Sequence, residues 1–257
     1  MILLACAQPP EEDVAIADAP FPEVEAPTSA PTWDAAGIEA AWAEAVSRGF
    51  PEVERPRDTW HALLAYGDET CPGDPDFLVD EVLTGCTAES GYVYAGVGGY
   101  VEVTEESHGF VGWQVHADAT VTDAEGATFW VGGNVYHLED TDEEGAFVEE
   151  RIEGTWRWEG DDAWLADWTS GLLTFTLRDT LAMEGALTFS GLSFAADGFS
   201  FDAEGLASGT LSVRDPGGAW HTVTYANGAC GDVTFDGDAL GEACLDFQPL
   251  LDTWASR

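Results

Sequence analysis

The sequence predicts a mainly β fold: an antiparallel meander of roughly 9–12 strands that forms one large curled sheet or an open barrel. Three observations carry this prediction. From Gly91 onward, apolar and polar residues alternate with a period of two, as in strands with one buried face. Gly-rich stretches such as "RDPGGAW" and "YANGAC" separate the alternating segments and are typical of hairpin turns. After residue 70 no segment has a convincing helical period.

One or two short helices are expected before the strands. The segment "TWDAAGIEAAWAEAVSRGF" has apolar residues at helical spacing, with Thr32 or Asp34 as a cap at its start and Gly49 at its end. The apolar face consists of Ile38, Ala41, Trp42, Ala45 and Val46. A second helix is expected from Asp58 through "TWHALLAYG", and its apolar face consists of Trp60, Leu63 and Leu64. We interpret both helix tryptophans as core contacts.

Residues 111–137 are the clearest hairpin. On one side of the expected turn the apolar set is Val111, Trp113, Val115, Ala117, Ala119 and Val121, and on the other it is Ala127, Phe129, Val131, Gly133 and Val135. Ala124-Glu125-Gly126 suits a three-residue loop with Gly in the left-handed conformation. A shift by one residue would bury Thr against Phe, so the register is well specified. It pairs Val121 with Phe129, Ala119 with Val131 and Val115 with Val135.

Alternation recurs through the rest of the chain. In "VEERIEGTWRW", Ile152, Trp156 and Trp158 point to one side, while Arg151, Glu153 and Arg157 point to the other. Similar strands are "LLTFTLR", "GALTFSGLSF", "GTLSVRD" and "WHTVTY". Glycines inside strands, such as Gly96, Gly98 and Gly99, suit bulges or sharp curvature. Long alternating runs favour one curled sheet or an open barrel over a compact sandwich.

Four of the five cysteines form two pairs that are local in sequence. An even number in an exported protein predicts disulfides, and we favour Cys71–Cys86 and Cys230–Cys244 among the three possible connectivities. In "CGDVTFDGDALGEAC", folding about Gly237 places Cys230 opposite Cys244, where the Cβ atoms of cross-strand neighbours come close enough for a disulfide. A metal site is a weaker alternative, because C-x-x-C spacing and nearby histidines are lacking.

The charge balance excludes several kinds of partner. The chain has 49 Asp and Glu against 8 basic residues, all of them Arg, so its formal net charge is −41. Nucleic acids and anionic lipid surfaces would repel such a chain. The acidic excess suits a solvated surface, and weak Ca²⁺ binding is the alternative interpretation. The runs "DETCPGDPD", "DTDEEG" and "DGDALGE" are turn-like, but no EF-hand loop is present.

The first residues contain a candidate export and lipidation signal. Leu3-Leu4-Ala5-Cys6 resembles the lipobox at which bacterial lipoproteins are cleaved and then lipidated on the new terminal cysteine. The apolar stretch before Cys6 is shorter than a secretory signal, so this resemblance implies a signal that begins upstream. With the composition, it makes the chain similar to uncharacterised acidic lipoproteins of Gram-negative bacteria. In that family a residue other than Asp after the cysteine implies the outer membrane, and here it is Ala7.

The expected domain organisation follows from this lipobox-like signal. Residues 1–6 are a truncated signal and lipobox remnant. Residues 7–31 contain six Pro and many acids without an apolar period, which predicts a disordered tether. Residues 32–257 are expected to fold as a single mainly β domain with N-terminal helices. The expected location is therefore the outer membrane or the extracellular side, through a lipid anchor at Cys6, with a plain secreted protein as the alternative.

One group of residues is a candidate ligand site. On the polar face of the hairpin 111–137, exposed aromatic rings are expected beside amide and imidazole groups, a combination that suits a sugar or another small polar ligand. This group consists of Gln114, His116, Trp130, Asn134 and Tyr136. The alternative is that helices or another sheet layer cover this face.

No catalytic or cofactor motif is present: Walker loops, nucleophile elbows and H-E-x-x-H are absent. In the predicted register, His116 and His137 point to opposite faces and do not share a metal. We therefore expect a non-catalytic cell-envelope protein with a structural or interaction role and no cofactor. The alternatives are a carbohydrate- or small-ligand-binding module, with a glycan or protein as partner, and a secreted hydrolase.

Overall fold

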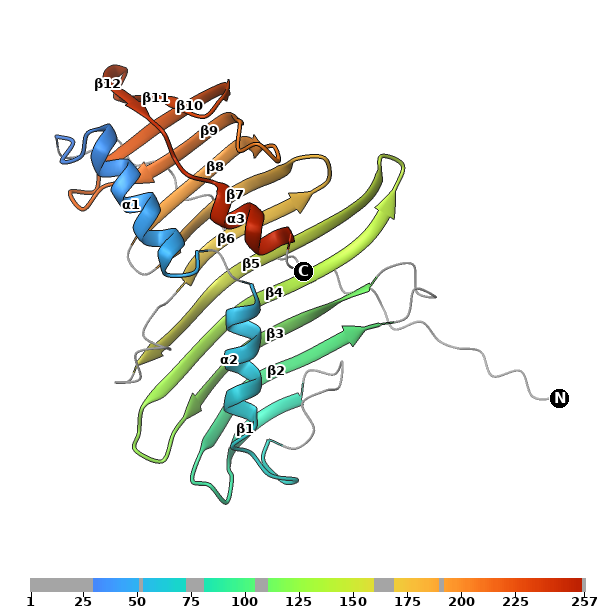
Figure 1. Cartoon of the computed structure of the whole chain (residues 1–257). Helices are drawn as coiled ribbons and strands as arrows, with labels where there is room; N and C mark the ends of the chain where they lie inside the picture. Colours follow the sequence, from blue (N-terminus) through green and yellow to red (C-terminus); the bar gives the residue numbers. More distant parts are fainter. Residues whose placement is uncertain are drawn as a thin grey trace, which may run out of the picture.

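The computed structural model describes residues 30–50, 53–72, 81–104, 111–159, 169–189 and 192–255. Within these ranges twelve strands form one antiparallel sheet, in which the order in space is the order in sequence. The end strands β1 and β12 each pair with a single neighbour, so the meander is an open sheet (Figure 1). The predicted fold class is thus confirmed. Cys6 and residues 7–29 of the predicted tether lie outside the described residues.

The strands have these bounds: β1 Glu81–Thr87, β2 Val93–Val103, β3 Val111–Thr122, β4 Thr128–Asp142, β5 Gly145–Glu159, β6 Thr169–Leu177, β7 Leu181–Phe189, β8 Leu192–Phe201, β9 Ala207–Arg214, β10 Trp220–Gly228, β11 Gly231–Phe235 and β12 Asp238–Ala243. Strands β4 and β5 are the longest, with 15 residues each. Their hairpin extends beyond β3 and β6, because β3 pairs with β4 only as far as Glu139 and β6 pairs with β5 only from Val148.

The β3–β4 hairpin has the predicted register. Val121 pairs with Phe129, Ala119 with Val131, and Val115 with Val135. At the turn, Gly126 has a φ of +95°, and its N–H donates to the carbonyl of Asp123 over 3.2 Å. A residue with a side chain would be strained in this conformation, which is why the sequence has glycine there. On β3, Val115, Ala117, Ala119 and Val121 are buried, and the residues that alternate with them point to the opposite face.

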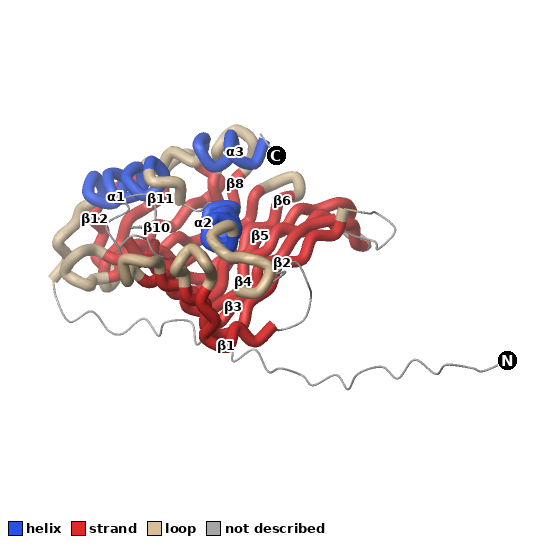
Figure 2. Tube along the Cα trace, turned by 90° about the horizontal axis from the view of Figure 1, so that it is seen from below, coloured by secondary structure: helices blue, strands red, loops and turns tan. Residues whose placement is uncertain are grey.

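Three helices lie on the apolar face of the sheet, which we call the inner face (Figure 2). Their bounds are α1 Ala35–Ser47, α2 Glu54–Leu64 and α3 Gln248–Ala255. Helix α1 contacts the sheet through Trp42 and Phe194, whose ring centroids are 5.7 Å apart. Helix α3 does so through Trp254 and Phe175, at 6.2 Å. The opposite side, which we call the outer face, has no described helix on it.

Helix α1 agrees with its prediction in detail. The side chain of Asp34 accepts the backbone N–H of Gly37 over 3.0 Å, which satisfies one of the unpaired donors at the helix start. After the last turn, Gly49 has a φ of +86°. The predicted apolar face is buried except for Val46, which is half-buried against the core.

The other two helices differ from the prediction. Helix α2 begins at Glu54, four residues before the predicted Asp58, because Pro56 falls in its first turn, where the missing N–H costs nothing. Helix α3 was not predicted. It is only eight residues long, so its buried residues Leu250 and Trp254 give too short a periodic signal.

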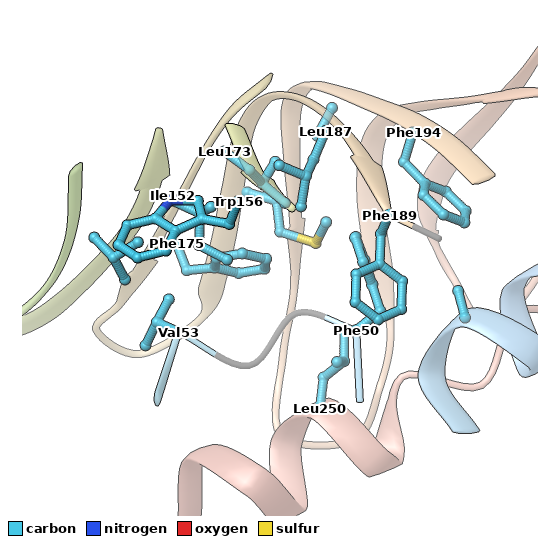
Figure 3. Packing of buried hydrophobic residues seen from close by; sticks show 14 of the residues in the cluster. Phe50, Val53, Ile152, Trp156, Leu173, Phe175, Leu187, Phe189, Phe194 and Leu250 are labelled. Carbon is cyan, nitrogen blue, oxygen red and sulfur yellow. The ribbon is translucent and has the colours of Figure 1, made fainter. Parts of the chain in front are cut away.

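The core between helices and sheet is rich in aromatic rings. Trp42 contacts Phe50, Phe194 and Phe247, with ring centroids 5.3–5.9 Å apart. Figure 3 shows Phe50, from the segment after α1, beside Phe189 and Phe194 of the sheet. The indole N–H of Trp42 donates to the carbonyl of Asp246 over 2.8 Å, so this buried polar group is satisfied. Trp42 and Trp60 are both 1% exposed, which confirms their interpretation as core residues.

Glycines let backbone and side chains approach closely at two kinds of position. At Gly98 on β2, an added Cβ would lie 2.6 Å from the ring of Trp60, so glycine is what allows α2 to rest on the sheet. At the centre of the sheet, Gly133, Gly154 and Gly171 are cross-strand neighbours on β4, β5 and β6. Gly154 has a φ of +89°, and an added Cβ would lie 1.9 Å from the carbonyl oxygen of Gly132.

Both predicted disulfides are present. Cys71 and Cys86 are joined with a Cα–Cα distance of 5.6 Å, and Cys230 and Cys244 with one of 4.1 Å. The second bond closes the β11–β12 hairpin, in which Phe235 pairs with Asp238 across the predicted turn at Gly237. Two disulfides indicate an oxidising, extracytoplasmic environment. None of the described helices has both the length and the hydrophobicity needed to cross a bilayer.

A buried carboxylate holds the start of the folded domain. Asp215, in the turn after β9, accepts the backbone N–H of Thr32 over 2.6 Å and the hydroxyl of Thr32 over 2.8 Å. It also accepts the N–H of Ala219 and lies 3.2 Å from Nε2 of His221, which is completely buried. Burial raises the pKa of Asp215, but these hydrogen bonds outweigh burial and hold the pKa well below its usual value.

This carboxylate predicts a specific dependence of stability on pH. Asp215→Asn should lower the free energy of unfolding by about 1–3 kcal/mol at pH 7, because buried donors lose a charged acceptor. The folded-state pKa is depressed, so the contribution is complete above the unfolded pKa of about 3.9 and is lost as the pH falls below it. Urea unfolding of both proteins from pH 7 to pH 3 measures the difference. A difference that grows on acidification would contradict this account.

Candidate functional site

The structure places all five predicted site residues on the outer face of β3 and β4. Gln114 pairs with Tyr136, and His116 pairs with Asn134. Trp130 pairs with Thr120, which lies four residues from His116 on the same strand. Strand alternation sends these side chains away from the buried set that begins with Val115. The helices lie on the other face, so the alternative in which they cover this group does not apply to the described residues.

The group is preorganised by hydrogen bonds. The amide of Gln114 donates to Oδ1 of Asn134 over 2.9 Å, which fixes two amide groups side by side. Trp130 is 49% exposed, a large exposed fraction for a residue type that is highly buried on average. His116 is exposed as well. The arrangement combines an open aromatic ring with fixed amide groups, which can stack on a ligand and exchange hydrogen bonds with its hydroxyls.

Tyr136 belongs to a second, charged layer that the sequence prediction left out. Its hydroxyl donates to the carboxylate of Glu149 on β5. Burial, and then this neighbouring carboxylate, raise the pKa of Tyr136 far above its ordinary value, so it stays a neutral donor at physiological pH. Arg151, its cross-strand neighbour, forms an ion pair of 2.9 Å with Glu153, which in turn pairs with Asn134. Arg151 therefore offsets one of these two carboxylates, and Asp118, which pairs with Gly132 between His116 and Thr120, adds another on the same face.

The signal for these β5 residues was in the sequence. The alternation in "VEERIEGTWRW" already assigned Arg151 and Glu153 to the polar side of their strand. Their alignment with β4 required the turn at Gly145, which pairs with Asp142 and sets the register of the whole hairpin. The acidic run "DTDEEG" contains a single glycine, and in the structure this Gly145 has the positive φ of the turn, +116°.

The inner face holds a different polar pair. His137 lies opposite Trp113, as predicted, and their rings stack with centroids 6.2 Å apart. Nδ1 of His137 is 2.8 Å from a carboxylate oxygen of Glu150, which is completely buried, and Nε2 is 3.4 Å from Glu139. The guanidinium carbon of Arg57, on α2, lies over the Trp113 ring, 4.7 Å from its centroid. This stack connects α2 to the sheet and is separate from the outer face.

Metal ligation has little support among the described side chains. No group of three or more His, Cys, Asp or Glu residues there is arranged to hold a metal ion. His116 and His137 point to opposite faces of the sheet, as the register predicted. In the acidic run "DTDEEG", Asp142 is paired with Arg178 of the β6–β7 turn, and this pairing lowers the pKa of Asp142.

Comparison with known proteins adds no family to this description. No protein-family model, no curated protein and no solved structure matches the chain. The functional argument therefore rests on the geometry of the chain itself.

Proposed function

We propose that this is a non-catalytic binding protein of the bacterial cell envelope, carried on a lipid anchor at Cys6. The two disulfides support export to an oxidising compartment. The lipobox-like Leu3-Leu4-Ala5-Cys6 supports lipidation, and the acidic, Pro-rich residues 7–31 support a tether between anchor and domain. Ala7 after the cysteine supports the outer membrane as the destination.

The anchor predicts the behaviour of one substitution. Cys6→Ser, introduced into the natural gene, should move the protein from the membrane fraction to the soluble fraction, because a serine there cannot be acylated as the lipobox cysteine is. Ala7→Ser is the matched control and should remain with the membrane. Fractionation followed by immunoblotting measures both. Membrane association of Cys6→Ser equal to that of the control would refute the anchor.

The binding role is supported above all by one observation: the polar outer face is left open while every described helix covers the apolar inner face. An open polar face by itself needs no function, but this one carries a Trp with half of its surface in water on the same face as a fixed amide pair. The ligand class this supports is a sugar or another neutral polar molecule. The site comprises Gln114, His116, Trp130, Asn134 and Tyr136, with Arg151 and Glu153 beside them.

Removal of one aromatic ring tests the binding role. Trp130→Ala should reduce retention on a glycan array about tenfold without lowering the free energy of unfolding by more than about 0.5 kcal/mol, because the ring is on the surface. Tyr66→Ala is the matched control, since Tyr66 is 50% exposed and lies just after the end of the inner-face helix α2, away from the outer face. The control should bind like the wild type. If Trp130→Ala and Tyr66→Ala are retained equally on every glycan that the wild type binds, the binding site does not include Trp130.

A further inference from the structure

The outer face continues from the candidate site across β8, β9 and β10, and there it changes character. Outward positions on these strands are those that alternate with the buried residues Phe194, Leu211 and Val223. Most of them carry hydroxyl groups, and we call this set the hydroxyl strip: Ser193, Ser200, Ser208, Thr210, Ser212, Thr222 and Thr224.

The strip is neutral in a strongly acidic molecule. Of the outward positions on these three strands, Asp197 alone carries a carboxylate, and it lies at the β8 bulge. The chain as a whole has 49 acidic residues and a formal net charge of −41. A surface that served only to keep the protein soluble would carry the acids here too. Their scarcity over three adjacent strands points to a partner that contacts this surface and would be disturbed by charge.

The strip and the candidate site are connected by continuous cross-strand pairing. Gly132, two residues from Trp130, pairs with Thr155 on β5. Further along the same row, Thr188 on β7 pairs with Ser193, and their hydroxyl oxygens are 2.9 Å apart. Ser193 then pairs with Arg214, and Arg214 pairs with Trp220 on β10. Trp220 alternates with the buried His221 and so faces outward.

Trp220 therefore stands at one end of this row and Trp130 lies two residues from its other end, with Thr155, Thr188, Ser193 and Arg214 between them. Strands β4 and β10 are six strand spacings apart in the sheet, which corresponds to roughly 29 Å along the row. This is too long for a single sugar and suits a chain of several. Hydroxyl groups and a fixed amide pair exchange hydrogen bonds with sugar hydroxyls, and tryptophan rings stack on the apolar faces of sugars.

We infer that the outer face binds a neutral polysaccharide chain that runs across the strands from Trp130 to Trp220. This inference rests on the proposed binding function and names its ligand class. Charge determines which class of polymer can bind. A polyanion would be repelled by the molecule as a whole. A polycation would bind the acid-rich regions in preference to the hydroxyl strip. A surface with few carboxylates favours the binding of a neutral polymer, because few charged side chains have to be desolvated when the polymer covers it.

Affinity electrophoresis of the full-length protein tests the inference. The probes are the neutral polysaccharides dextran, laminarin and hydroxyethyl cellulose, with alginate as the anionic comparison. At least one neutral polymer should retard the wild type, and alginate should not. Trp130→Ala and Trp220→Ala should each weaken binding about tenfold, as expected for loss of one stacked aromatic contact. Thr222→Glu, which places a carboxylate within the strip, should weaken binding similarly.

Ala203→Glu is the control for Thr222→Glu. Residue 203 lies in the exposed turn between β8 and β9, so the substitution adds the same charge away from the strip. It should bind like the wild type, and circular dichroism should show that all four variants are folded. Two results would overturn the inference. One is that alginate retards the wild type more than every neutral polymer does, and the other is that none of the neutral polymers retards it.

A further outcome separates the inference from the proposed function. If Trp130→Ala weakens binding of a neutral polymer while Trp220→Ala and Thr222→Glu bind like the wild type, the binding role stands. The ligand then occupies the candidate site alone, and the extended polysaccharide path is wrong. If all three variants bind like the wild type, both the inference and the proposed site fail.

Discussion

Val115→Asp should unfold the domain or lower its free energy of unfolding by several kcal/mol, because it places an unpaired carboxylate on the inner face. Val115 is completely inaccessible and lies in the central β3–β4 pairing, opposite Val135. No described cation is its neighbour in the ladder: its cross-strand partners are Val135 and Tyr100. The core cannot hydrate the charge without separating helices from sheet.

Thr120→Asp is the control for Val115→Asp, because it places the same carboxylate on the opposite face of the same strand. Thr120 is five residues along the same strand and faces outward, where it is partly exposed beside Trp130. A carboxylate there stays hydrated and should cost less than about 1 kcal/mol. Urea denaturation of both variants measures the difference. Similar losses would mean that both faces of β3 are covered, and the candidate site would then be inaccessible.

Gly154→Ala should have the second largest effect, a loss of about 3 kcal/mol or more from added strain and overpacking. Its φ of +89° is unfavourable for alanine, and the new methyl group would meet the backbone of β4 rather than a flexible side chain. Neither strand can move without breaking the ladder that joins β4 and β5 over their full length.

Gly132→Ala is the matched control for Gly154→Ala, because it adds the same methyl group to the same hairpin. At Gly132, an added Cβ would meet nothing closer than a carboxylate oxygen of Asp118 at 3.9 Å. The change should be within about 0.5 kcal/mol of the wild type, since alanine also reduces the freedom of the unfolded chain. Thermal unfolding followed by circular dichroism compares the two. Equal losses would show that the centre of the sheet tolerates wider strand spacing than the structure has.

The sequence was sufficient for the features that depend on local periodicity. The register of residues 111–137 followed from alternation and from one glycine, and both disulfides followed from spacing and hairpin geometry. For the cap of α1 the sequence offered Thr32 or Asp34, and the structure selects Asp34. In each case the information lies within about thirty residues of chain, so few alternatives compete.

Features that depend on contacts between segments distant in the sequence could not be predicted from the sequence. The contact of Thr32 with Asp215 joins residues 183 positions apart, and no periodicity reports such a pair. The buried Glu150 has an inward position in an otherwise apolar ladder, but whether His137 would lie beside it depended on the turn at Gly145. The five residues of the candidate site were placed correctly on one face, whereas the openness of that face depended on where three helices pack.

The central claim is that the open outer face of the sheet, at Trp130, is the binding surface. Hydroxyl-radical footprinting of the full-length protein, alone and with a saturating neutral polysaccharide, tests it most directly. In the free protein Trp130 should be oxidised rapidly and the buried Trp42 slowly, and the polysaccharide should protect Trp130 while leaving Trp42 unchanged. Slow oxidation of Trp130 in the free protein, or rapid oxidation that the polysaccharide leaves unchanged, would contradict the claim.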